Sequence, residues 1–113
     1  MSEVTFYSFL FAMTGILFVG LSIPLIQKRV PPNRYYGFRT AKTLSEPKIW
    51  YEVNRIQGKD LFVAGALITI SSLTMLLLAQ SWRPEHVIFT LLSVMVLSLV
   101  GVAWHGFRVL RRL

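Results

Sequence analysis

The chain has 113 residues, of which 54% are hydrophobic and 15% are charged, and its mean hydropathy is +0.56. Soluble domains carry about 25% charged residues, so this composition argues against a soluble enzyme, a disordered tail and a two-domain protein. The chain contains no cysteine, which excludes disulfide bonds, thiolate metal sites and cysteine nucleophiles, and its net charge is +7.

Three long stretches of the chain contain no charged residue. Each is long enough for a helix that crosses a bilayer, which needs about 20 apolar residues, and only a helix satisfies its own backbone hydrogen bonds in lipid. Three buried helices of a soluble protein would leave almost no chain to cover them. The sequence therefore predicts an all-α membrane protein, a single domain of residues 1–113 with three transmembrane helices over about 5–26, 61–80 and 87–106.

The basic residues are concentrated on one predicted side of the membrane. Eleven of the twelve Lys and Arg residues lie between the first two predicted helices or after the third, and none precedes the first. The first helix is therefore expected to remain in the protein rather than to be removed as a signal peptide. Because basic loops stay on the cytoplasmic side, we expect the N-terminus outside, with the C-terminus and the basic loop, residues 27–60, inside. This distribution indicates anionic phospholipids as partners and argues against nucleic acid.

The basic loop is predicted to contain an amphipathic helix next to the membrane. Pro31 and Pro32 end the first transmembrane helix, and Ser45 is the expected N-cap of the next helix, with proline in its first turn. From about 46 to 58, apolar side chains recur at helical spacing. We expect this segment to lie in the membrane interface with Trp50 at headgroup depth. The sequence leaves open whether it lies flat or extends the second transmembrane helix.

Two arginines of the loop, Arg34 and Arg39, flank a group of aromatic residues. Guanidinium groups beside aromatic rings can clamp a phosphate, a lipid headgroup or a carboxylate of a partner. The alternative is a basic loop whose arginines contact lipid phosphates without further function. Gly37, between the two arginines, predicts a tight turn. Asn54 is expected to hydrogen-bond the loop backbone or the first helix, or else to contact a ligand.

These residues belong to a longer pattern. It runs Pro32-Asn33-Arg34-Tyr35-Tyr36-Gly37-Phe38-Arg39-Thr40, then Thr43-Leu44, then Trp50, Asn54-Arg55 and Gly58. The pattern resembles the signature of the SdpI family, which includes a bacterial integral-membrane immunity protein against a secreted killing factor. The resemblance covers roughly residues 25–80. It implies a protein of the bacterial cytoplasmic membrane that acts in toxin immunity and signalling, with a secreted toxin and a cytoplasmic repressor as partners.

The pattern supplies a set of candidate residues for binding a ligand or partner: Asn33, Arg34, Tyr36, Gly37, Arg39, Thr40, Trp50, Asn54 and Arg55. No catalytic residue, metal or cofactor is expected, because the three apolar stretches contain no charged residue and no catalytic motif is present. His86 and His105 fall on opposite predicted sides of the membrane and so cannot share a metal. A second function stays open, that of an accessory subunit of a larger membrane complex whose basic loop binds lipid or partner.

Small residues recur at helical spacing along all three predicted helices. Such stripes let membrane helices approach closely, so we expect them to pack the bundle, with self-association as the open alternative. The stripes are Ser8, Ala12 and Gly15 in the first helix, Gly65, Thr69 and Ser72 in the second, and Ser98 and Gly101 in the third.

Overall fold

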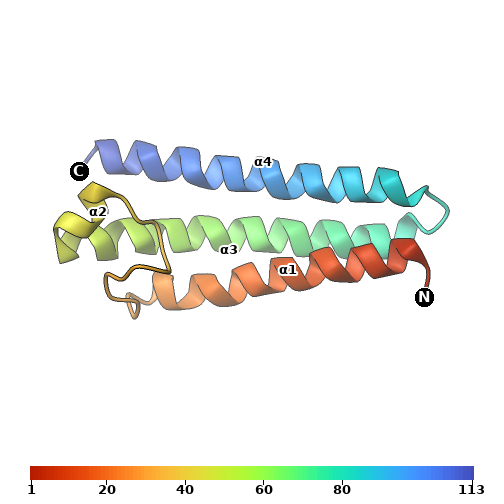
Figure 1. Cartoon of the computed structure of the whole chain (residues 1–113), viewed down its shortest axis with the longest axis horizontal. Helices are drawn as coiled ribbons and strands as arrows, with labels where there is room; N and C mark the ends of the chain where they lie inside the picture. The colour runs from red at the N-terminus through yellow and green to blue at the C-terminus, as the bar shows by residue number, and fades with distance from the viewer.

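The computed structural model describes residues 1–113 as four helices. These are α1 (Glu3–Ile26), α2 (Ala41–Ser45), α3 (Pro47–Leu78) and α4 (Pro84–Arg111). The three long helices lie side by side in an elongated bundle of 51 × 23 × 19 Å, with α3 between α1 and α4 in the view of Figure 1. All three are long and apolar enough to cross a membrane, which confirms the prediction of an all-α, multi-pass membrane protein.

The segment predicted as a separate interfacial helix is instead the first part of α3. This helix has 32 residues and at 1.5 Å per residue is about 48 Å long, whereas the hydrocarbon core is about 30 Å thick. Residues 46–58 thus extend the second transmembrane helix, and the expectation of a helix lying in the interface is wrong. Gly58 does not bend α3. It lies against α1, where an added Cβ would approach the backbone nitrogen of Ile26 to 3.0 Å.

Two further details of this segment concern Trp50 and Ser45. Trp50 has no exposed surface and packs inside the protein, and its depth relative to the lipid headgroups stays a prediction. Ser45 is the last residue of α2, and the N-cap of α3 is Glu46, which makes no side-chain capping bond. The short helix α2 is a feature that the sequence did not predict. Its N-cap is Thr40, whose side chain and that of Thr43 cap each other's backbone N–H groups.

The small residues of α1 and α3 pack these two helices closely. A Cβ added to Gly15 would lie 2.7 Å from the carbonyl oxygen of Gly65, and one added to Gly65 would lie 2.7 Å from the carbonyl oxygen of Gly15. Ser8, Ala12 and Ser72 are also buried. The expected packing role is confirmed for these two helices, whereas a Cβ added to Gly101 of α4 would meet no atom within 4 Å.

The apolar core of the bundle sits at the end opposite the basic loop. Val4 of α1, Ala79 after α3, and Val87 and Leu91 of α4 form a buried cluster there. Most other large apolar side chains point outward, for example Leu97, which is 71% exposed. In a membrane these side chains contact lipid, so their exposure is consistent with the three spans.

Candidate functional site

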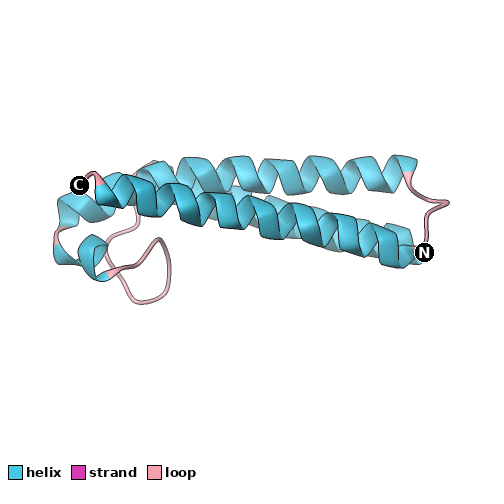
Figure 2. Cartoon of the chain, turned by 90° about the horizontal axis from the view of Figure 1, so that it is seen from above, coloured by secondary structure: helices cyan, strands magenta, loops and turns pink.

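The candidate site is at the loop end of the bundle, which we define as residues 27–46 together with the start of α3 and the last turns of α4. Figure 2 shows the segment between α1 and α2 standing out from the bundle at this end. In Figure 1, α2 lies beside the C-terminal end of α4. The candidate residues identified from the sequence lie in this region.

The turn of the loop is folded around the side chain of Asn33. Its Oδ1 accepts hydrogen bonds from the backbone N–H groups of Tyr35 and Tyr36, both at 2.8 Å. Its Nδ2 donates to the carbonyl oxygens of Pro31 at 2.8 Å and Tyr36 at 3.1 Å. The Arg39 Nε donates to the carbonyl oxygen of Asn33 at 2.8 Å. One amide side chain therefore sets the course of the chain between the two arginines.

Gly37 brings this turn against α3. Its φ is +113°, a conformation that side chains disfavour, so the expected tight turn is confirmed. A Cβ at this position would lie 2.8 Å from Asn54 Oδ1 and 3.1 Å from the ring of Trp50. Only glycine therefore allows the turn to sit directly on these two side chains.

Asn54 and Trp50 fasten the loop to α3 by hydrogen bonds. Asn54 Oδ1 accepts from the Phe38 backbone N–H at 2.6 Å, and its Nδ2 donates to the Trp50 carbonyl oxygen at 3.0 Å. Trp50 Nε1 donates to the carbonyl oxygen of Val30 at 2.8 Å. Both side chains are almost completely buried. Because a buried polar group without a partner is costly, these bonds hold the loop in one place.

The same loop also contacts α1 and α4. The Tyr36 hydroxyl donates to the carbonyl oxygen of Leu21 in α1, and partial burial raises the pKa of this phenol. The Phe38 ring packs edge-on against Phe107 of α4, with centroids 5.3 Å apart. Lys42 Nζ donates to the carbonyl oxygen of Leu110 at 2.8 Å, near the C-terminus of α4, where a cation is favourable. The loop is thus bonded to all three spanning helices.

The candidate residues divide into two groups by what their side chains contact. The residues that build the loop and fix it to the bundle are Asn33, Tyr36, Gly37, Thr40, Trp50 and Asn54. Arg34 and Arg55, by contrast, make no hydrogen bond or ion pair within the chain, and Arg39 uses only Nε. Their guanidinium groups are therefore the ones available to a ligand or partner.

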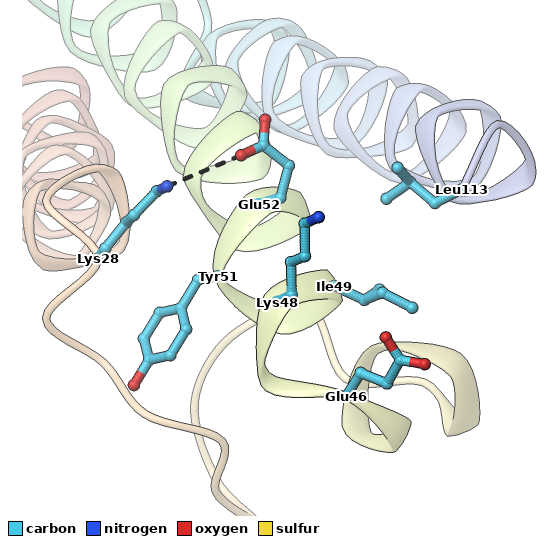
Figure 3. Close-up of a pocket in the computed structure, with 7 residues that line it drawn as sticks. All are labelled: Lys28, Glu46, Lys48, Ile49, Tyr51, Glu52 and Leu113. Carbon is cyan, nitrogen blue, oxygen red and sulfur yellow. Dashed lines mark ion pairs between the residues drawn. The ribbon is translucent and has the colours of Figure 1, made fainter.

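A hollow of 680 Å³ on the loop end contains none of the nine candidate residues. Figure 3 shows its lining side chains, which come from the start of the loop, the junction of α2 and α3, and the C-terminal residue. Lys28 Nζ lies 3.8 Å from Glu52 Oε2 across it. No pattern in the sequence indicated this hollow, because it forms where the chain turns from α2 into α3. The lining residues are Lys28, Glu46, Lys48, Ile49, Tyr51, Glu52 and Leu113.

A polar cluster between α3 and α4 was also missed from the sequence. His105 Nδ1 lies 2.5 Å from Asp60 Oδ2, and Gln57 Nε2 donates to the same oxygen at 2.8 Å. Gln57 packs on α4 where Gly106 has no side chain, since a Cβ there would lie 2.6 Å from Gln57 Cδ. Asp60 and His105 lie on different helices and are 45 residues apart in the chain. Their contact can be recognised only when the register of α3 against α4 is known.

Comparison with protein families identifies the group to which this loop belongs. The model of the SdpI/YfhL protein family matches residues 29–105. The chain belongs to this family. The match includes the loop, α2, α3 and most of α4, and it begins after α1. All nine candidate residues, and the contacts that Asn33 and Asn54 make, therefore fall within the part that defines the family.

Similarity to a Bacillus protein gives little more about function. The chain is 34% identical over 61 residues to the uncharacterized protein YfhL of Bacillus subtilis (strain 168). The matched segment is 50% of this chain and 56% of that protein, so the chain spans about half the length of this curated relative. No solved structure matches the chain.

Proposed function

We propose that this chain is a non-catalytic membrane protein that gives immunity to a membrane-acting toxin and signals toxin binding through its basic loop. The observation that carries the proposal is the attachment of one loop to all three spanning helices. Family membership supports the same class of function, because the SdpI signature was recognised in this loop. The distribution of basic residues supports a cytoplasmic loop and an N-terminus on the outside.

The attachment offers a physical route for a signal. A toxin that shifts α4 relative to α1 within the membrane would strain the contacts of Lys42 with Leu110 and of Phe38 with Phe107. The loop would then leave its resting position on α3, and Arg34 would move with it. A change of this kind alters the surface that a cytoplasmic repressor meets, including the hollow beside Lys28 and Glu52. Signalling of this kind needs two positions of the loop and no chemical step.

The free guanidinium groups supply the means of binding. Arg34 is exposed and has no partner within the chain, and Arg55 also keeps all its donors. Arginine binds carboxylates and phosphates through two parallel hydrogen bonds. Arg34 lies on a loop whose backbone is held by hydrogen bonds and Arg55 lies on α3, so little backbone entropy is lost on binding.

The experiment is a toxin challenge of cells that produce the chain. Cells are exposed to the secreted killing factor that SdpI-type immunity proteins counter, and survival is compared at equal membrane levels of each variant. We expect the wild-type chain to protect and the Arg34→Ala/Arg39→Ala variant to lose protection. The matched control Lys59→Ala/Arg112→Ala removes two exposed cations that have no side-chain partner, and should still protect. Absence of protection by the wild type, or equal protection by both double variants, would overturn the proposal.

The second candidate function is that of an accessory subunit in a larger membrane complex. It is favoured by Gly101 of α4, which faces open space although small residues on α1 and α3 are used for packing. A glycine on an exposed helix face permits close approach of another membrane helix. Purification in mild detergent tests it: a larger partner in fixed stoichiometry would favour this function, and a chain free of other proteins would exclude it.

A further inference from the structure

An apolar crevice opens between α1 and α4 beneath the loop. Its volume is 280 Å³, and eight of its ten lining residues are hydrophobic. Phe18 and Leu21 of α1 form one wall, and Leu99 and Val102 of α4 form the other. At the opposite end of the bundle, Val4, Val87 and Leu91 close the same space by direct packing. The crevice is therefore confined to the half of the bundle near the loop.

The position of the crevice matches the leaflet at the loop end. The α1 wall reaches from Phe18 to Leu25, in the last part of the uncharged stretch of α1, and is about 10 Å long at 1.5 Å per residue. Tyr36, Gly37 and Phe38 close the crevice where the basic loop begins. With the uncharged stretch of α1 in the hydrocarbon core, a lipid of this leaflet would have its acyl chain alongside the crevice and its headgroup level with the loop.

The loop segment that closes the crevice is flanked in the sequence by positive charge, which favours an anionic headgroup. Arg34 and Arg39 flank the three loop residues that line the crevice, and both arginines are exposed. Arg34 has all its donors free, and Arg39 keeps its two terminal amino groups. Eleven of the twelve Lys and Arg residues of the chain lie at this end. Guanidinium groups bind phosphate through paired hydrogen bonds, so an anionic headgroup fits this end.

We propose that the crevice and the two arginines bind one anionic phospholipid from the leaflet at the loop end. One acyl chain occupies the space between α1 and α4, and Arg34 and Arg39 bind the phosphate. A peptide helix is 10–12 Å across, so a helical stretch as long as the α1 wall fills about 800–1,100 Å³, which is far more than the 280 Å³ of the crevice. A single hydrocarbon chain is much thinner and fits this volume. The site shares Arg34 and Arg39 with the proposed function, but lipid binding needs no toxin, because it requires only the membrane in which the chain resides.

Binding of the acyl chain in the crevice is tested by native mass spectrometry of the whole protein released from lipid nanodiscs. The nanodiscs contain equal amounts of phosphatidylglycerol and phosphatidylcholine with identical acyl chains. We expect one phosphatidylglycerol to stay bound to the wild type. Leu99→Trp, and separately Val102→Phe, fill the crevice and should abolish retention. Val100→Trp adds the same bulk at a position that is 59% exposed and outside the crevice, and should retain the lipid.

Recognition of the anionic headgroup by the two arginines is tested in the same nanodiscs. Arg34→Gln/Arg39→Gln should lower the preference for phosphatidylglycerol over phosphatidylcholine by about tenfold, because each removes a cation close to the headgroup. Lys59→Gln/Arg112→Gln removes equal charge elsewhere and should leave the preference nearly unchanged. Equal retention of the two lipids by the wild type overturns the proposal, as does full retention by both crevice-filling variants. Retention of a peptide in place of lipid also overturns it.

Discussion

Asn54 on α3 holds Phe38 of the loop through the backbone, with its Oδ1 accepting the Phe38 N–H at 2.6 Å. The side chain that accepts this bond is 2% exposed, so the bond is shielded from water. Gly37, the neighbour of Phe38, allows the approach because it has no Cβ. The position of the basic loop thus depends on a few buried contacts, and each can be tested by a single substitution.

Gly37→Ala should destabilise the loop by about 1–3 kcal/mol, because alanine disfavours a φ of +113° and its Cβ would lie 2.8 Å from Asn54 Oδ1. Thermal unfolding in detergent measures the effect, and limited proteolysis of residues 27–46 locates it. Gly20→Ala is the matched control, since a Cβ there meets no atom within 4 Å and Gly20 lies inside α1. Equal stability of the two variants would contradict the role given to Gly37.

Tyr36→Phe should reduce the decrease in the free energy of unfolding at alkaline pH. Burial raises the pKa of the Tyr36 phenol above its ordinary value of 10.0, so the folded protein resists ionisation that the unfolded chain undergoes. The stability that Tyr36 contributes is complete below pH 10 and declines as pH rises above it. Unfolding of the two proteins compared between pH 8 and 11 gives the difference. Tyr35→Phe, at a residue that is 90% exposed, should follow the wild type, and identical profiles for all three proteins would refute the prediction.

Gly65→Ala should weaken the contact between α1 and α3. The added Cβ would lie 2.7 Å from the Gly15 carbonyl oxygen and 2.9 Å from the Val19 nitrogen, both backbone atoms that cannot turn aside. Overpacking of this kind costs about 1–3 kcal/mol. Unfolding by sodium dodecyl sulfate in mixed micelles measures it. Gly101→Ala places the same methyl group in open space, so a comparable loss in that variant would show that the small-residue contact is not the cause.

Lys42→Met should loosen the last turn of α4, because it removes the ammonium group that binds the Leu110 carbonyl oxygen. The site is half-buried, and loss of a charge-assisted bond there is expected to cost about 1 kcal/mol. Hydrogen exchange of the amides at 107–111 should accelerate by about fivefold. Lys59→Met, at an exposed lysine without a partner, should leave this exchange unchanged, and the same acceleration in both variants would rule out a specific bond.

The three membrane-spanning helices could be predicted from the sequence because each is indicated by residues that are adjacent in the chain. A long uncharged stretch indicates a membrane helix whatever surrounds it, and Gly37 predicted its turn for the same reason. The extension of α3 through Gly58 was not predictable, since the glycine lies in the helix on account of its contact with Ile26 of α1. The burial of Trp50 depends likewise on a distant partner, the carbonyl oxygen of Val30.

Among the candidate residues, too, some properties could be predicted from the sequence and others required the folded structure. Asn33 and Asn54 were singled out by a pattern of residues, but their bonds to Tyr35 and Phe38 required the folded loop. The pair of Asp60 and His105 joins residues far apart in the chain, and no local pattern links them. Charge and residue type therefore indicated the candidate site, and packing between helices determined which of its side chains make no contact within the chain.

The most direct test of the central claim, that one loop is held by all three spans, is a distance measurement between spin labels. The chain has no native cysteine, so labels can be placed at Tyr35→Cys on the loop and Arg111→Cys at the end of α4, both exposed positions. Double electron–electron resonance in nanodiscs should give one narrow distance distribution. Adding Lys42→Met and Phe107→Ala, which remove both loop contacts to α4, should broaden it. A broad distribution without these changes, or an unaltered one with them, would contradict the account.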